Sequence, residues 1–404
     1  MEKQKTRKLA WFKIFSVMKG RDKMKILFAS DSFKGSLTSS QINQLLTAAA
    51  QEVFPGCDCR GVMMADGGEG TLEAVLEETG GSLHTVKVKN PLFEEMNAQY
   101  GITGEGSALV EMARASGLPL IGSGRRNPAE TTSYGTGQLI ADAISNGCRE
   151  ITVSLGGSAT NDGGMGAMRA LGARFLDESG AELAGRGGDL EKVRRIEADR
   201  LKERIRDVTF TAMCDVISPL LGERGATYTF GPQKGADAQM LKRLECGMEN
   251  YASVLRRVLG VEVDAIPGGG AAGGLGAALL TFCGAKLKSG VETVLDLLRF
   301  DSLLPGVSLV VTGEGRIDCQ SAEGKVVSGV GKRCKAAGVP AVAIVGGIAG
   351  GYETIYDCGI CSVMPTISGA MTLETALKAA EKLYFDAALR MFRLVRAGIK
   401  IGGR

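Results

Sequence analysis

The sequence predicts a two-domain protein of the α/β class, and three observations support this. The 404 residues are enough for two domains, each with its own core. Apolar strand-like runs alternate with helical patterns near both ends of the chain, which is typical of a doubly wound parallel sheet. Short alternating segments in the middle predict antiparallel strands. The simplest architecture is therefore one α/β domain in two segments, 24–82 and 286–392, with a mixed α/β domain, 83–285, inserted between them.

The first segment repeats a strand–loop–helix pattern, with strands expected at 25–29 and 60–65 and helices at 39–53 and 71–79. The inserted part is expected to hold antiparallel strands at 84–88, 98–102 and 108–112, helices at 135–147, 165–171 and 236–258, further strands at 151–155 and 208–213, and an apolar helix opened by the glycine run 267–276. The last segment resumes the first pattern, with strands expected at 308–312, 341–345 and 361–364.

Charge and cysteine usage narrow the classes of function. Residues 1–23 carry a net charge of +6, against +3 for the whole chain, so the remainder is acidic and nucleic acid is not an expected partner. Segment 1–23 is too short and interrupted for a signal peptide or a membrane span. We expect a disordered extension or a start assigned too early, before Met24, with a weak amphipathic membrane contact as the alternative. A basic tail is expected at 393–404. The ten scattered cysteines predict a reducing, cytoplasmic setting.

Six polar, glycine-bearing loops carry the candidate site: 30–38, 66–71, 156–164, 231–235, 268–276 and 313–318. Loop 156–164 joins an expected strand to an expected helix, so its backbone N–H groups can converge on an anion. The alternative is a plain glycine-rich connection. Neither a Walker A pattern nor the dinucleotide pattern Gly-x-Gly-x-x-Gly follows the first strand. The single histidine, His84, argues against serine–histidine hydrolysis.

The loops offer what phosphoryl transfer needs, namely carboxylates for a metal ion and cations for phosphate. The carboxylates are Asp66, Glu69, Asp162, Asp215 and Asp318, and the cations are Lys34, Lys234, Arg316 and Lys325. Taken singly, a loop aspartate is more often a helix cap or a turn former, and a loop lysine a solvated charge. The functional interpretation rests on their recurrence at strand ends.

Several motifs together resemble the type I bacterial glycerate kinases over about residues 24–390. They are Ala29–Leu37 (ASDSFKGSL), Ala65–Thr71 (ADGGEGT), Thr132–Gly137 (TSYGTG), Gly156–Gly164 (GGSATNDGG), Phe230–Ala236 (FGPQKGA), the glycine run 268–276 and Val311–Asp318 (VTGEGRID). The sequence departs from the family pattern at Ser30, where proline is frequent, and at Cys319, where serine or threonine is. Neither difference removes an ionisable group.

The resemblance implies a flavodoxin-like parallel-sheet domain in two segments and an inserted domain described as restriction-enzyme-like. It also implies ATP-dependent phosphorylation of D-glycerate, most often on the 2-hydroxyl, with Mg²⁺ as a further cofactor. Three alternatives stay open. The kinase could act on the 3-hydroxyl, or the protein could bind an anionic metabolite without catalysis. An oxidoreductase is the less favoured third. A cytoplasmic monomer or homodimer without nucleic-acid or membrane partners is expected.

The expected site residues fall into three groups. Catalysis is expected of Lys34, Asp162, Asp215, Arg316 and Asp318. Metal binding is expected of Asp66, Glu69 and Asp215. Substrate or phosphate binding is expected of Asp31, Ser32, Gly35, Gly67, Gly68, Gly156, Gly157, Ser158, Thr160, Asn161, Gly163, Lys234, Gly313, Gly315 and Lys325. We expect Asp318 or Asp162 to orient the attacking hydroxyl, and Arg316 or Lys325, with amides of 156–164, to hold the substrate carboxylate.

Overall fold

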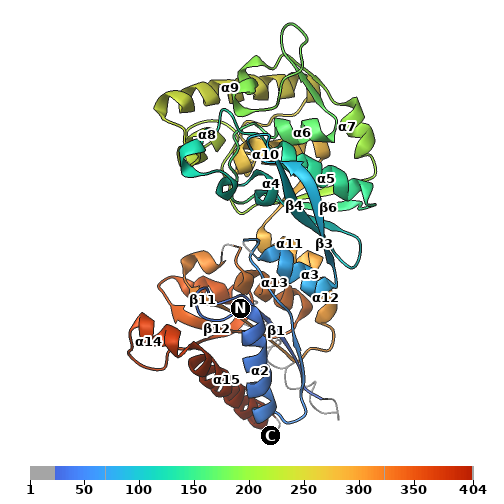
Figure 1. The fold of residues 1–404 in the computed structure, drawn as a ribbon. Coiled ribbons are helices and arrows are strands. Elements are labelled where there is room, and N and C mark those ends of the chain that lie inside the picture. Colours follow the sequence, from blue (N-terminus) through green and yellow to red (C-terminus); the bar gives the residue numbers. More distant parts are fainter. Residues whose placement is uncertain (1–22, 69, 323, 403–404) are drawn as a thin grey trace, which may run out of the picture. The chain divides into compact units, whose positions relative to one another are not determined.

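The chain divides into two compact units, which are described separately below (Figure 1). The structure is a computed structural model that describes residues 23–68, 70–322 and 324–402. The first unit combines Met1–Asp66 with Val291–Arg404, and the inserted unit is Gly67–Gly290. Helix α3 (Thr71–Thr79), which we had assigned to the first α/β segment, falls in the inserted unit. The expected extension 1–23 lies outside the described residues except for Lys23.

The first unit is built on a five-stranded sheet in which every neighbouring pair is parallel. Its strands are β1 (Lys25–Ser30), β2 (Asp58–Gly61), β11 (Leu309–Ile317), β12 (Ala341–Ile348) and β13 (Ile360–Pro365). The spatial order β13-β12-β11-β1-β2 is the order 2-1-3-4-5 of flavodoxin-like sheets when the strands are numbered within the unit. The predicted fold class is thus confirmed.

One face of this sheet is covered by α2 (Ser39–Val53) and α15 (Ala380–Gly402), which lie side by side (Figure 1). Helix α2 begins at a capping box, in which Thr38 accepts from the N–H of Gln41 and the Gln41 side chain accepts from the N–H of Thr38. The apolar stripe of α2, including Ile42, packs with Phe28 of β1 and Phe392 of α15 in one buried core. Of the tail expected at 393–404, residues 393–402 continue α15, and the last two lie outside the described residues.

The opposite face carries α13 (Val326–Ala337), which contacts β11 and β12. Gly329 of α13 allows α11 (Gly290–Leu297) to approach closely, because a Cβ atom there would meet Val291 and Leu295. The unit also contains the short helices α12 (Phe300–Leu303) and α14 (Leu373–Lys378) and the 3-10 turns Cys319–Ala322 and Tyr352–Tyr356. Since α2 follows β1 and α13 follows β11, the connections of these adjacent strands leave toward opposite faces.

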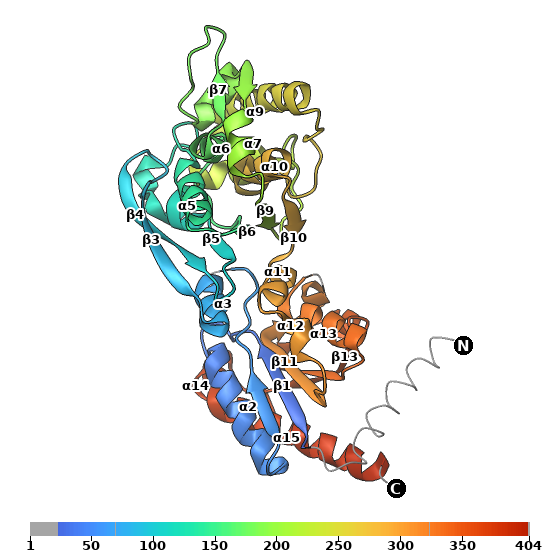
Figure 2. The same ribbon diagram turned by 90° about the vertical axis from the view of Figure 1, so that its right-hand side faces the viewer.

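The inserted unit contains a six-stranded mixed sheet in the order β10-β9-β6-β5-β4-β3 (Figure 2). Its strands are β3 (Ser82–Lys89), β4 (Glu95–Ile102), β5 (Ala108–Glu111), β6 (Glu150–Ser154), β9 (Thr209–Met213) and β10 (Lys286–Lys288). The β3–β4 and β4–β5 pairs are antiparallel, as predicted, and the other three pairs are parallel. A separate antiparallel pair joins β7 (Arg174–Leu176) to β8 (Arg195–Glu197).

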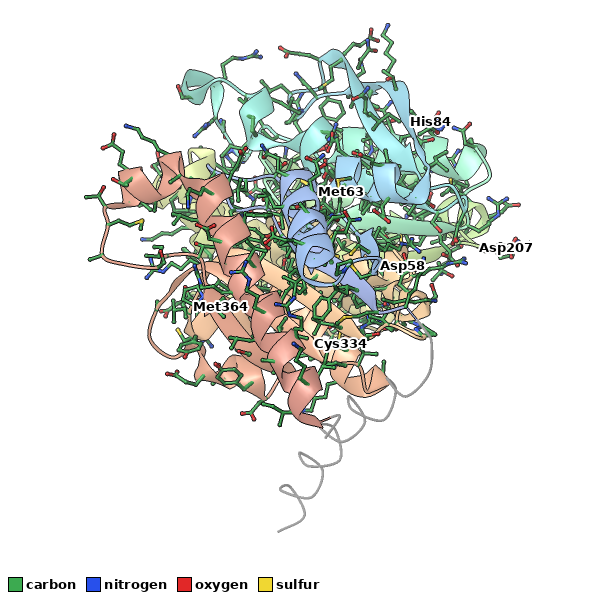
Figure 3. All side chains as sticks on the ribbon, turned by 90° about the horizontal axis from the view of Figure 1, so that it is seen from below. Asp58, Met63, His84, Asp207, Cys334 and Met364 are labelled. Atoms are coloured by element: carbon green, nitrogen blue, oxygen red, sulfur yellow. The ribbon has the colours of Figure 1, made fainter. Side chains whose placement is uncertain are left out.

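The helices of this unit are α3, α4 (Ala113–Ser116), α5 (Tyr134–Ser145), α6 (Met165–Leu171), α7 (Asp199–Arg204), α8 (Ala226–Phe230), α9 (Ala238–Leu259) and α10 (Ala271–Cys283). Apolar side chains of α5, α6, α9 and α10 share one core with the sheet. His84 lies on β3, at one edge of the sheet (Figure 3). Its ring stacks on Tyr100 with 5.4 Å between the ring centroids.

Two predicted strands differ from the structure in their bounds. The second strand is Asp58–Gly61 rather than 60–65, because pairing with β1 ends at Gly61 and the buried residues that follow run outside the ladder. The segment 313–317, expected as a loop, continues β11, since its pairing with β12 extends to Ile317 and Ile348. At Gly313 a Cβ atom would collide with the carbonyl oxygen of Ile344, so the neighbouring strand requires glycine there.

The inserted unit begins and ends at neighbouring positions. Gly67 has a φ of +92°, and a Cβ atom on it would lie 2.7 Å from the Cα of Gly290 and 2.9 Å from the sulfur of Met213. Glycine is required at position 67 both by this close approach and by its left-handed backbone.

Candidate active site

A pocket of about 500 Å³ lies in the first unit, where the chain leaves β1, β11 and β12. Its lining includes Asp31 and Lys34 after β1, Asp66, and residues Glu314 to Arg316 of β11. Because the connections of β1 and β11 leave to opposite faces, this is the topological switch point of the sheet. Ligands of open α/β sheets bind at this place.

The loop after β1 is held by its own backbone and by the sheet. The Asp31 N–H donates to the Gly313 carbonyl at 3.0 Å, and the Ser32 N–H donates to the Asp31 carboxylate at 2.7 Å. Phe33 is buried and packs edge-on against Tyr384 at 5.3 Å between centroids. Gly35, with a φ of +80°, makes the turn that follows. Asp31, Ser32 and Lys34 are thereby placed at the pocket.

The first acidic side of the pocket contains Asp31 and Asp66. Burial, followed by the neighbouring Asp66 charge, raises the pKa of Asp31 from 3.8 to about 6. The ammonium nitrogen of Lys34 lies 3.6 Å from a carboxylate oxygen of Asp66, and the Lys34 side chain is 82% exposed. A pair so exposed contributes little to stability, so Lys34 is available to a ligand at small cost.

The second acidic side is formed by Glu314 and Asp318. Glu314 is 7% exposed, and among the described residues its Oε1 atom has no hydrogen-bond partner. Lys325 lies 4.0 Å from the other oxygen of Glu314 and 3.7 Å from a carboxylate oxygen of Asp318. Burial raises the pKa of Glu314, a hydrogen bond with Ser321 and the charge of Lys325 oppose the shift, and the charges of Asp31 and Asp318 reinforce it. A buried carboxylate with a raised pKa that faces a pocket is suited to proton transfer.

Sequence reasoning did not select Glu314, although it lies in the quoted 313–318 motif. The motif was taken as a loop, in which an acidic residue is ordinary. In the structure Glu314 is a strand residue that follows the buried Val310, Val311 and Thr312. A carboxylate that continues an apolar strand run is the signal that could have identified it, because unpaired acidic residues are rarely buried.

Arg316 is exposed and lines the same pocket, as predicted for a residue that meets an anion. Gly315 lines it too, and a Cβ atom there would come 3.6 Å from Phe33 Cα, so the loop after β1 passes close to β11. The predicted site residues of the first unit therefore converge, with Gly313 serving the packing of the strands.

Loop 156–164 of the inserted unit is largely internal. Gly156 and Gly157 are exposed, whereas residues 158–164 are buried. Asp162 is fully buried and accepts from the Ser133 N–H and hydroxyl, both at 2.7 Å, and from the N–H groups of Gly164 and Gly166, both at 3.1 Å. Burial raises the pKa of Asp162, and these donors oppose the shift. The Asp162 carboxylate thus fixes the start of α6.

Lys234 is also internal. It is 1% exposed, and its ammonium group donates to the Thr160 carbonyl at 2.6 Å. Burial lowers the pKa of Lys234 from 10.5 to about 7, with Asp162 opposing the shift. Asn161 donates to the Thr227 hydroxyl at 3.3 Å, and the Gly163 N–H donates to the Gly273 carbonyl at 2.9 Å. Thr160 and Lys234 are therefore engaged within the unit, and Ser158 is 8% exposed. Asn161 is fully buried, and its Oδ1 atom has no hydrogen-bond partner among the described residues.

The remaining predicted residues lie near the ends of the inserted unit. Asp215 follows β9, is exposed, and accepts from the Gly290 N–H at 2.9 Å. Gly67 makes the close approach described above, and the Gly68 carbonyl accepts from the Thr71 hydroxyl at 2.7 Å. Glu69, predicted as a metal ligand, lies outside the described residues.

No cluster of three or more histidine, cysteine, aspartate or glutamate side chains is arranged to hold a metal within residues 23–68, 70–322 and 324–402. Mg²⁺ is usually bound by one or two carboxylates together with substrate phosphates and water. The first unit supplies such a donor set in Asp31 and Asp66, whose proximity is reflected in the pKa of Asp31. The residues present therefore fit a Mg²⁺ ion that arrives with a phosphate ligand.

Comparison with known proteins decides the family. The sequence profile described as the glycerate kinase family matches residues 26–396. The chain belongs to the glycerate kinase family.

Individual members of the glycerate kinase family are similar over almost their whole length. The chain is 42% identical to a glycerate 2-kinase of Escherichia coli K12, with 94% of this chain and 99% of that protein covered. It is also 42% identical to a glycerate kinase of Halalkalibacterium halodurans, with 90% and 96% covered. A crystal structure of a Salmonella typhimurium LT2 protein described as glycerate kinase 2 matches with a TM-score of 0.83 and 41% identity, covering 94% of this chain and 100% of that one. In the part of the chain that the structure describes, no helix has the length and apolar character needed to cross a membrane.

Proposed function

We propose that this protein is an ATP-dependent glycerate kinase that transfers the γ-phosphoryl group of ATP to the 2-hydroxyl of D-glycerate, giving 2-phosphoglycerate and ADP. The observation that carries the proposal is the pocket of the first unit, where carboxylates and cations converge at the switch point of the sheet. Membership of the glycerate kinase family supports the substrate, and the resemblance to a glycerate 2-kinase supports the 2-hydroxyl.

Lys34, Arg316 and Lys325 are the cations of the reaction in this proposal. Lys34 contacts the transferring phosphoryl group, because it is exposed at the pocket, where its ion pair with Asp66 is a surface one. Arg316 and Lys325 bind phosphate or the glycerate carboxylate, for which a planar guanidinium and an ammonium are both suited. Charge spreads over the oxygens of the transferring group in the transition state, so fixed cations stabilise it.

Asp31 and Asp66 would hold Mg²⁺, directly or through water, and Asp215 is a further candidate ligand. When bound, the ion would neutralise phosphate charge and orient the leaving group. The pKa of Asp31 is raised to about 6, mainly by burial and next by the charge of the nearby Asp66 carboxylate.

Glu314 takes the hydroxyl proton in this proposal, and Asp318 orients the same hydroxyl. As the glycerate oxygen forms its bond to the γ-phosphorus, the bond from that phosphorus to the bridging oxygen of ADP breaks. The hydroxyl proton passes to the Glu314 carboxylate, whose Oε1 atom is unpartnered among the described residues. A carboxylate oxygen of Asp318 lies 3.7 Å from the ammonium nitrogen of Lys325.

For the inserted unit we propose a division within loop 156–164. Exposed Gly156 and Gly157 are the part that can present backbone N–H groups to an anion. Asp162 and Lys234 fix the buried remainder of the loop through the contacts described above. In this proposal Asp162 and Lys234 are positioning residues. The sequence instead predicts that Asp162, or Asp318, orients the attacking hydroxyl and that Lys234 binds substrate or phosphate.

A coupled assay of ADP release with D-glycerate, followed by NMR of the product, tests the function and the position of phosphorylation. The 3-phosphoglycerate product would move the reaction to the other hydroxyl. Glycerate binding without ADP release would favour a non-catalytic sensor, and an absorbance change with NAD(P)H an oxidoreductase.

Lys34→Ala and Asp215→Asn test the site assignment in the same assay. Both are expected to lower kcat while the protein stays folded, because each position is exposed. Near wild-type turnover in both variants would remove these residues from the site. We also propose a cytoplasmic location and a monomeric or homodimeric state, which cell fractionation and sedimentation would test.

A further inference from the structure

One half of the pocket in the first unit is apolar and is not used by the reaction scheme above. Its lining includes Ile348 at the end of β12, Ile367 after β13, and Leu373 and Leu377 on α14. These side chains are 41%, 37%, 73% and 43% exposed, respectively. We call these four residues the apolar wall. Large aliphatic side chains gathered at a pocket commonly mark a binding surface.

We propose that the apolar wall binds the base of the nucleoside triphosphate by non-polar contact, without hydrogen-bonded recognition of its edges. This inference rests on the proposed function and adds to it the nucleobase subsite. The wall is continuous with the charged half of the same pocket, where Lys34, Arg316 and Lys325 lie. A ligand that fills both halves must carry anionic groups at one end and an apolar group at the other.

Of the two substrates, only the nucleotide has this form. Glycerate consists of a carboxylate and two hydroxyl groups, so none of its parts gains from leaving water beside leucine and isoleucine. A purine base is a flat, largely apolar ring that does. The pocket volume of about 500 Å³ is within the range typical of sites for ligands of nucleotide size.

The wall offers little with which to distinguish one base from another. Among the described residues that line the pocket beside the wall, two carry hydroxyl groups: Thr366, which donates to the Gly346 carbonyl at 3.2 Å, and Tyr384, which is fully buried. Pockets that recognise a ligand by apolar contact discriminate much less than pockets built to hydrogen-bond it. We therefore expect GTP to replace ATP with kcat/KM within about a hundredfold.

The first experiment compares nucleotides in the wild-type protein. ATP, GTP, CTP and UTP are supplied as phosphoryl donors, and kcat/KM is measured for each by product formation. Comparable values support the wall as described. Discrimination against GTP by about ten thousandfold or more would mean that the base is read by hydrogen bonds, and would overturn the proposal.

The second experiment changes the wall itself. The double variant Leu373→Gln, Leu377→Gln is expected to raise the KM for ATP on the order of tenfold, with kcat and the KM for glycerate unchanged. Both positions are exposed, so folding is preserved. Leu394→Gln is the matched control, since Leu394 is 64% exposed in the same unit but does not line the pocket. It should leave all constants unchanged.

Inorganic triphosphate separates the base from the phosphates. As a competitor of ATP it has no base, so its inhibition constant should be equal in the wild type and the double variant. An unchanged KM for ATP, a raised KM for glycerate alone, or a loss of self-association in sedimentation would each overturn the proposal. The last outcome would identify a second copy of the chain as the occupant.

Calorimetric titration with ATP and GTP in the absence of glycerate keeps this inference distinct from the proposed function. If wall variants weaken nucleotide binding but D-glycerate is never phosphorylated, the proposed function fails and the nucleobase subsite stands. If the variants phosphorylate D-glycerate with an unchanged KM for ATP and bind ATP as tightly as the wild type, the subsite fails and the function stands.

Discussion

The pocket of the first unit and loop 156–164 of the inserted unit are built from similar residue types but differ in structure. Both have glycines and carboxylates after strands, and each is accompanied by a lysine, Lys34 at the pocket and Lys234, from loop 231–235, against loop 156–164. In the pocket, Glu314 keeps an oxygen atom unpartnered among the described residues, and Lys34 is exposed. In the inserted unit, Asp162 of the loop accepts four hydrogen bonds, and Lys234 of loop 231–235 is buried against the Thr160 carbonyl.

The difference between the two carboxylates, Glu314 and Asp162, lies in whether their oxygen atoms find donors within their own unit, whereas the Oδ1 atom of Asn161 in the loop finds none among the described residues. A buried polar group without partners is costly, so a fold retains one mainly where a ligand completes it. A fully satisfied network instead rigidifies its surroundings. Residue type and spacing alone do not separate these two cases, whereas the hydrogen-bond partners do.

The largest expected effect is the loss of turnover in Glu314→Gln. Glutamine preserves shape but cannot take the hydroxyl proton, so kcat should fall at least about a hundredfold. Unfolding in urea should show no loss of stability, because a buried carboxylate is replaced by a neutral group. Glu353→Gln, an exposed change in the same unit, is the control. A Glu314→Gln protein with full activity would remove Glu314 from proton transfer.

Asp162→Ala should act on stability rather than on chemistry. It removes the acceptor of four hydrogen bonds inside the unit and leaves buried donors such as the Gly166 N–H unpaired. We expect the free energy of unfolding of the inserted unit to fall by about 3 kcal/mol. Asp162→Asn, which keeps one acceptor oxygen, should lose less. Equal stability of the alanine variant and the wild type in urea would contradict the internal role.

Lys234 should make stability depend on pH in the alkaline range. Burial lowers the pKa of Lys234 to about 7, so between about pH 7 and 10.5 the unfolded chain binds more protons than the folded one. The stability that Lys234 contributes through this difference is complete above its unfolded pKa of 10.5 and is lost as the pH falls toward 7. The cost of Lys234→Met should therefore increase between pH 7 and 9, on the order of 1–2 kcal/mol. A cost independent of pH, measured by urea unfolding, would disprove this.

Asp31 should make stability fall with rising pH in the acid range, which is opposite to the effect of Lys234. This is the smallest of the expected effects. Burial and Asp66 raise the pKa of Asp31 from 3.8 to about 6, so the folded protein binds more protons in that interval and loses stability as pH rises through it. In the absence of ligands, the free energy of unfolding of Asp31→Asn relative to the wild type should rise by on the order of 1 kcal/mol between pH 4 and 6. Asp207→Asn, at an exposed position of the inserted unit, is the control. A parallel pH dependence in wild type and variant would argue against this burial.

The sequence allowed the fold to be predicted further than the site. Helix α2 was predicted with its observed bounds, because an apolar stripe at helical spacing is a local signal. The bounds of β2 and β11 were missed, since they depend on pairing with strands far along the chain. The same limit applies to the site. The burial of Lys234 depends on its contact with Thr160, and no local pattern contains that contact.

The contact between Gly67 and Gly290 has a consequence for the order of folding. Strands β1 and β11 pair although the whole inserted unit separates them in sequence. Closing so long a loop costs entropy, and that cost falls sharply once Gly67 and Gly290 are already together. We therefore expect the inserted unit to fold first and to act as a short covalent bridge for the first sheet. Pulsed hydrogen exchange would then detect protection in β6 and β9 before β1 and β11.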